Sequence, residues 1–220
     1  MKYPSDFSNW TTQMTHRAFG LRDVDTLPSL SEWMQMPISL TARDEERLQE
    51  IVEYGKRRVA FWGEGDIKLK MLGPLLLVCN IDNQLFSTFS EISVKTHLTT
   101  LENDVLFVSG RPDLMIATGE FEPSLPYFCM QEYKPKKKSS DPRGQTLIAL
   151  MAARQLNKTV SDKPMTLYGA FSVGRDWTFM TLENNEYALS RGFFLDQEKD
   201  IYEVARRFRA LKLLIDRAVM

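Results

Sequence analysis

The feature that most constrains the fold is a pair of apolar runs separated by a short polar turn. The runs are "VLFVSGRPDLMIATG", residues 105–119, and "YFCMQEYK", residues 127–134. Both contain many β-branched and aromatic residues, and the polar, proline-containing stretch "GEFEPSL" stands between them. This pattern predicts two strands joined as a β-hairpin.

Charged residues interrupt these apolar runs at Asp113, Glu132 and Lys134. Residues two apart in a strand share a face, so Glu132 and Lys134 project together while Tyr133 points to the other side. If the strands pair, Asp113 lies opposite them, and two such carboxylates tend to hold a proton unless a cation sits between them. A few oxygen ligands that leave positions for water suit Mg²⁺ or Mn²⁺. The pattern therefore predicts a metal-dependent site in which Lys134 orients an attacking water and steadies charge on phosphorus.

The same three residues also have a simpler interpretation. Glu132 and Lys134 would form a solvent-facing ion pair, and Asp113 would be an ordinary residue at a strand end. A PD followed at this distance by ExK arises by chance in roughly one chain of this size in twenty at average residue usage. The spacing alone leaves both interpretations open.

The segments around the hairpin predict one α/β domain over residues 41–220, with residues 1–40 as an arm packed on it. Thr41 and Asp44 resemble a capping box that opens a helix over residues 41–62. Further predicted helices cover residues 64–78, with a kink or restart at Pro74, and residues 139–157 and 198–219. Further predicted strands cover residues 85–98, 165–174 and 177–190.

"RPD" and "EYK" resemble the second and third motifs of the PD-(D/E)XK nuclease superfamily, which has the restriction-endonuclease-like fold. The order helix, strand, PD strand, ExK strand, helix agrees with that superfamily. The stretch "EGDIKLKMLGPLL" resembles a helix in the nuclease domains of type I restriction subunits. The resemblance covers about residues 62–175 and extends to small bacterial proteins that keep this domain without a helicase motor. It implies a mixed central sheet flanked by helices, with an αβββαβ core.

The resemblance also implies roles for residues of the predicted hairpin. Asp113 and Glu132 would hold Mg²⁺ or Mn²⁺, helped by the main-chain carbonyl of Tyr133. Lys134 would position the attacking water. These roles describe a hydrolase that cuts phosphodiester bonds.

Two more residues enter the site through the resemblance. Glu64 matches the acid carried by the first helix and would be a further metal ligand, although Glu50 or Glu53 of the preceding helix could take its place. Gln145 matches a glutamine in the helix after the ExK strand and would touch the substrate phosphate or the lysine. In the plainer interpretation, Glu64 is an acid favoured at a helix start and Gln145 is a surface residue.

The segment "KPKKKSSDPRG" is strongly basic within an otherwise balanced chain. The net charge is −1 and the isoelectric point is about 6.2, so attraction to phosphate has to come from a local patch. We interpret the segment as a phosphate-binding rim beside the predicted metal site, although most such charge runs are solvated loops. Its basic side chains are Lys134, Lys136, Lys137, Lys138 and Arg143.

The remaining features predict a cytoplasmic protein. Cys79 and Cys129 lie in apolar runs, which indicates buried free thiols in a reducing compartment. The chain has no run of 18 apolar residues, so no contact with a membrane is expected. Nucleic acid is the expected partner, with DNA favoured over RNA, and the sequence is compatible with a homodimer.

Two functions of different classes follow from this pattern. The first is a metal-dependent nuclease. The second is a catalytically inactive module that keeps the nuclease fold to bind nucleic acid or a protein. Binding of divalent metal separates them, because only the nuclease requires it.

Overall fold

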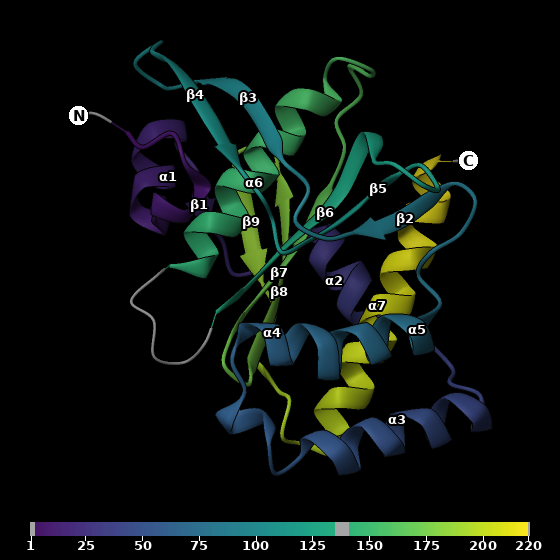
Figure 1. The fold of residues 1–220 in the computed structure, drawn as a ribbon. Coiled ribbons are helices and arrows are strands. Elements are labelled where there is room, and N and C mark those ends of the chain that lie inside the picture. Colours follow the sequence, from purple (N-terminus) through teal and green to yellow (C-terminus); the bar gives the residue numbers. More distant parts are fainter. Residues whose placement is uncertain (1–2, 135–140, 220) are drawn as a thin grey trace.

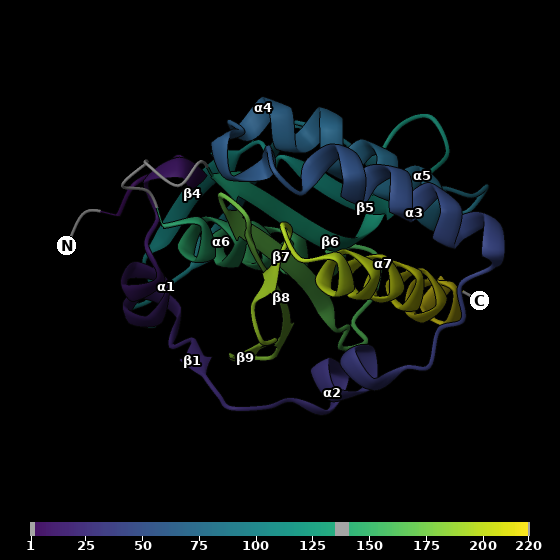
Figure 2. The ribbon, with the colours of Figure 1, turned by 90° about the horizontal axis from the view of Figure 1, so that it is seen from below.

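The computed structural model describes residues 3–134 and 141–219. They form a mixed α/β fold in which helices cover both faces of a large mixed sheet (Figures 1 and 2). The α-helices are α1 (Thr12–Phe19), α2 (Pro28–Gln35), α3 (Ala42–Gly55), α4 (Glu64–Ile67), α5 (Gly73–Cys79), α6 (Pro142–Asn157) and α7 (Glu198–Val219). Shorter helical turns are η1 (Phe7–Asn9), η2 (Val59–Phe61) and the π-helical segment η3 (Lys68–Leu72).

The main sheet has the strand order β1-β9-β8-β7-β6-β5-β2, with β10 paired to β8. Pairs β6–β7 and β1–β9 are parallel, and the other pairs are antiparallel. Strands β3 and β4 form a separate two-stranded sheet. The strands are β1 (Arg22–Asp23), β2 (Phe86–Phe89), β3 (Val94–Thr99), β4 (Val105–Gly110), β5 (Leu114–Thr118), β6 (Ser124–Lys134), β7 (Leu167–Val173), β8 (Asp176–Glu183), β9 (Glu186–Leu189) and β10 (Phe193–Phe194).

Two apolar cores lie on opposite faces of the main sheet. Helix α6 packs on β6 and β7 on one face, where α1 and the β3–β4 hairpin also contact it (Figure 1). On the other face α7 packs with α2, α3 and α5. Tyr133 of β6 faces this second core, and its ring lies 5.3 Å from that of Trp177 between centroids. The alternation of β6 therefore leaves Glu132 and Lys134 on the α6 side.

Several predicted elements are confirmed. The β5–β6 hairpin forms, α7 has the predicted bounds, and Thr41 and Asp44 make the capping box of α3. Asp141 caps α6, with Pro142 at its first position. Near Pro74, where a kink or a restart of the helix is expected, the π-helical segment η3 passes into α5 at Gly73 without a break in the helical backbone. Both cysteines are buried free thiols, and burial raises the pKa of each to about 12.

Three predicted strands are wrong because each is two strands. The run 85–98 divides into β2 and β3 at a bend where Glu91 has a positive φ of 55°. The run 105–119 divides into β4 and β5 at Pro112, which has no N–H to donate to a neighbouring strand. The run 177–190 turns at Asn184, with φ of 48°, and becomes the hairpin β8–β9.

The N-terminal arm is more regular than its sequence indicates. It contains α1 and α2, and its β1 pairs with β9 at the edge of the main sheet. The indole Nε1 of Trp33 in α2 donates to the carbonyl of Arg207 in α7 at 2.7 Å, and Arg207 donates back to the Trp33 carbonyl at 2.9 Å. None of the helices within residues 3–134 and 141–219 combines the length and apolarity needed to cross a bilayer.

Candidate functional site

Pairing of β5 with β6 places Asp113 beside the end of β6. Leu114 pairs with Gln131, and the Asp113 N–H donates to the Gln131 carbonyl at 3.1 Å. Asp113 thus stands next to Glu132 across the hairpin. The prediction that the hairpin brings these two carboxylates together is confirmed.

The PD dipeptide has a local structural reason. The Pro112 carbonyl accepts a hydrogen bond from the Glu91 N–H at 3.2 Å, so it is turned away from β6. In place of the Pro112 carbonyl, the Asp113 Oδ2 accepts a hydrogen bond from the Tyr133 N–H at 2.6 Å. A side-chain oxygen therefore continues the pairing of β6 beyond the first residue of β5.

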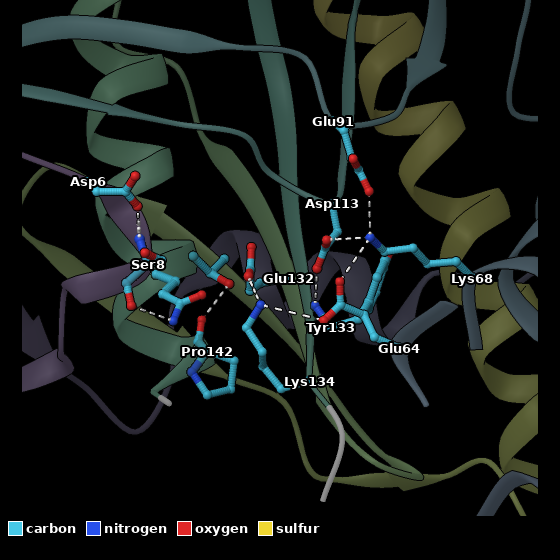
Figure 3. A network of polar contacts seen from close by, with 12 residues as sticks. Asp6, Ser8, Glu64, Lys68, Glu91, Asp113, Glu132, Tyr133, Lys134 and Pro142 are labelled. Carbon is cyan, nitrogen blue, oxygen red and sulfur yellow. Dashed lines mark hydrogen bonds and ion pairs between the residues drawn. The ribbon is translucent and has the colours of Figure 1, made fainter. Parts of the chain in front are cut away.

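Glu132 and Lys134 form a hydrogen-bonded ion pair on one face of β6 (Figure 3). Their side chains are only 13% and 12% exposed, so the predicted alternative of a solvent-facing pair is wrong. Burial, and next the negative charge of Asp113, raise the pKa of Glu132 to about 7. Burial disfavours the charged form of Lys134, but the hydrogen bond to Glu132 together with the negative charges of Glu132, Asp113 and Glu64 outweighs burial, and the pKa of Lys134 is raised.

Asp113 is buried as well, with 7% of its surface exposed. Burial raises its pKa, against the lowering effect of its hydrogen bonds with Lys68 and with the Tyr133 N–H. The site therefore concentrates acidic groups in a place where their charged forms are poorly solvated.

Glu64 belongs to the same cluster. It begins α4, and its Oε2 lies 3.9 Å from the Nζ of Lys134. The alternatives Glu50 and Glu53 are exposed on α3, where Glu53 accepts a hydrogen bond from Gln49. Of the three candidate acids, Glu64 is the one that contacts the predicted site.

Sequence reasoning missed Lys68 and Glu91. The Lys68 Nζ lies 2.6 Å from Asp113 Oδ1, 3.1 Å from Glu64 Oε1 and 3.0 Å from Glu91 Oε1 (Figure 3). A signal for Lys68 was present, because it follows Glu64 by four residues and so shares its helix face. Glu91 lies in the bend between β2 and β3, and its sequence context carries no comparable signal.

Gln145 is buried and is held by the N-terminal arm. Its Nε2 donates to the Ser8 carbonyl at 3.0 Å, so the alternative interpretation of Gln145 as a surface residue is wrong. Gln145 and Glu132 line one pocket of about 430 Å³. Its other walls come from η1 of the arm and from the end of β4, where Arg111 follows. Glu132 is thus reachable through a pocket that the arm helps to close.

The basic segment is only partly described. Lys136, Lys137 and Lys138 lie outside the described residues. Arg143 in the first turn of α6 forms an ion pair with Asp23 of β1 at 3.2 Å. Its charge is therefore shared with the N-terminal arm.

The carboxylates fit a hard divalent cation by the chemistry of their donors, since Asp113, Glu132 and Glu64 offer only oxygen. Their arrangement is different from a preformed metal centre. Within residues 3–134 and 141–219, no group of three or more His, Cys, Asp or Glu side chains is disposed to hold a metal ion. Instead, the ammonium groups of Lys68 and Lys134 stand between the acids.

Comparison of the chain with protein-family models and with curated proteins finds no match. Four residues predicted from the sequence meet at the candidate site, namely Glu64, Asp113, Glu132 and Lys134.

Proposed function

We propose that the chain is a Mg²⁺- or Mn²⁺-dependent phosphodiester hydrolase, a nuclease of the PD-(D/E)XK type that acts on DNA. The observation that carries the proposal is the buried meeting of Asp113 and Glu132 with Lys134 at the end of β6. Burial, followed by the negative charge of Asp113, raises the pKa of Glu132 to about 7, and a bound cation would favour the charged form of this carboxyl. The proposal includes the restriction-endonuclease-like version of the observed α/β fold.

The metal ligands in this proposal are Asp113, Glu132 and the main-chain carbonyl of Tyr133, with Glu64 as a further acid. A bound divalent ion would supply a Lewis acid that stabilises the charge developing on the phosphate. The chain itself fixes the orientation of Asp113, because one oxygen of its carboxylate is committed to the Tyr133 N–H. That commitment leaves Oδ1 directed toward the centre of the cluster.

Lys134 is the group that orients the attacking water. Its raised pKa keeps the ammonium charged at neutral pH, so it acts as a hydrogen-bond donor and a positive charge rather than as a general base. It shares its strand face with Glu132 and reaches toward Glu64. Substrate would approach through the pocket that Glu132 and Gln145 line, where Arg111 offers a positive charge.

A second candidate function has its own support. In the described structure every acid of the cluster already contacts a lysine: Lys68 serves Glu64 and Asp113, and Lys134 serves Glu132. A site in which each acid already has a lysine partner is what a catalytically inactive module would keep. Such a module would bind nucleic acid or a protein through the nuclease fold without cutting.

Calorimetric titration of Mn²⁺, run in parallel with nicking of supercoiled plasmid, separates the two candidates. Asp113→Asn removes a proposed ligand, and Asp66→Asn is the matched control. Asp66 is an acid of the same helix α4 as Glu64, but it pairs with Lys70 at 2.5 Å. The nuclease predicts that Asp113→Asn abolishes both signals and Asp66→Asn keeps both. Absence of Mn²⁺ binding in the wild-type chain would overturn the nuclease and favour the module.

A further inference from the structure

Lys68 occupies the centre of the acidic cluster. Its ammonium group lies within 3.1 Å of oxygens from three carboxylates, which belong to Asp113, Glu64 and Glu91. The closest contact, 2.6 Å, is to Asp113 Oδ1, the same oxygen that is left over after Oδ2 bonds to Tyr133. Figure 3 shows the Lys68 ammonium standing between Asp113 and Glu64, with Glu91 on its outer side.

The local fold directs Lys68 into this position. Lys68 follows Glu64 by four residues and opens the π-helical segment η3, which ends at Leu72, where α5 begins with Gly73. Segments of π-helix are uncommon and are frequent at functional sites. The Lys68 side chain is 20% exposed, whereas that of Lys70, on the same segment, is 39% exposed and bonds to Asp66. Only one of these two lysines therefore faces the cluster.

A divalent ion bound by Asp113 and Glu64 would need the oxygens that Lys68 now contacts. A second cation at the distances of these contacts would repel the ammonium strongly, because the surroundings are poorly solvated. The two cations therefore exclude each other. Glu91 is 62% exposed and offers the displaced ammonium a partner at the outer side of the cluster.

We propose that Lys68 is a resident counter-ion of the candidate metal site, which holds Asp113 and Glu64 in the metal-free protein and sets the affinity for the divalent ion by competing with it. This inference rests on the proposed nuclease function. Lys68 acts through the acids it contacts, so it is a positioning residue.

The test is calorimetric titration of Mn²⁺ into three variants of the full chain. Lys68→Gln removes the charge but keeps an amide donor for Asp113, Lys68→Arg keeps the charge, and Lys70→Gln is the matched control on the same segment. We expect Lys68→Gln to bind Mn²⁺ at least about tenfold more tightly than the wild type, because a neighbouring positive charge is gone. Lys68→Arg and Lys70→Gln should stay within about twofold of the wild type.

Melting curves with and without Mn²⁺ show whether the loss of Lys68 destabilises the acidic cluster. The melting temperature of Lys68→Gln should fall in chelator and recover in Mn²⁺ by more than the wild type gains. Equal or weaker Mn²⁺ affinity of Lys68→Gln, with a wild type that binds Mn²⁺, would overturn the role of Lys68 and leave the nuclease standing. Binding by Lys68→Gln alone would support the competition but overturn the nuclease, because the lysine would then keep metal out of the wild-type site, and binding by no variant would overturn both proposals.

Discussion

The Oδ2 of Asp113 accepts the backbone N–H of Tyr133 at 2.6 Å, so a side chain of the candidate site also completes the pairing of the central hairpin. The other oxygen of the same carboxylate contacts Lys68. Asp113 therefore links the strand that carries Glu132 to the helical segment that carries Lys68. Its substitution is expected to affect both stability and the site, and these effects can be separated.

Asp113→Asn and Asp113→Ala should differ in stability. Both variants lose the ion pair with Lys68, but the Asn carbonyl can still accept the Tyr133 N–H, whereas Ala leaves this buried donor without a partner. We expect Asp113→Ala to lower the free energy of unfolding by about 1–3 kcal/mol more than Asp113→Asn. Urea denaturation followed by far-UV circular dichroism measures the difference. Equal losses in the two variants would mean that the Tyr133 bond contributes little.

The sequence predicted the parts of this site that depend on the two-residue alternation of side chains along a β-strand. Glu132 and Lys134 share a face of β6, and Asp113 stands across the hairpin, because strand geometry alone requires it. The prediction from sequence was wrong where the chain turns without a strong turn signal among its residues. The bend at Glu91 divides a predicted strand and brings a fourth carboxylate to the cluster.

The sequence also did not predict the burial of Gln145. Its hydrogen bond to Ser8 joins residues 137 positions apart, and nothing local predicts that η1 of the arm covers the start of α6. Lys68 is an intermediate case. Its spacing from Glu64 indicates a shared helix face, but its contact with Asp113 depends on how the π-helical segment packs against β5 and β6.

Glu132 should make stability depend on pH in chelator. Its pKa is raised from an ordinary value of 4.5 to about 7, chiefly by burial. Between these values the folded protein binds more protons than the unfolded chain, so the free energy of unfolding falls as pH rises from about 4.5 to about 7 and then levels off. The fall attributable to Glu132 is on the order of 3 kcal/mol.

Glu132→Gln carries no such titration. The free energy of unfolding of Glu132→Gln should therefore change less between pH 5 and pH 8 than that of the wild type. Below pH 5 the two proteins should respond to pH to nearly the same extent. Urea denaturation at several pH values measures both profiles. Parallel profiles for the two proteins would show that Glu132 titrates normally and that the cluster does not strain it.

Gly144 in the first turn of α6 should be intolerant of a side chain. A Cβ there would lie 2.4 Å from the Thr11 carbonyl carbon and 2.5 Å from the Thr12 nitrogen, both backbone atoms of the arm. Gly144→Ala should cost about 1–3 kcal/mol and loosen the arm over α6. Hydrogen exchange of the arm amides, together with urea denaturation, measures both effects.

Gly65→Ala is the matched control, because it also adds a methyl group inside a helix next to a site residue. A Cβ at Gly65 has no heavy atom within 4 Å, so this variant should be neutral or more stable by about 0.5–1 kcal/mol. Similar losses in the two variants would mean that contact with the arm does not decide the outcome. Faster exchange confined to the arm in Gly144→Ala is the result that fits the geometry.

The three lysines at 136–138 should govern the salt dependence of nucleic-acid binding. Each phosphate contact by a lysine contributes about 0.9 to the slope of log affinity against log salt concentration on duplex DNA. Replacing all three by Gln should therefore reduce the slope by about 2 to 3 and weaken binding to unrelated sequences equally. Fluorescence anisotropy of a labelled duplex in a salt series measures the slope.

The charge-matched control replaces three exposed lysines elsewhere, Lys56, Lys158 and Lys199. An equal reduction in that control would show that overall charge, rather than the segment beside Lys134, attracts the nucleic acid.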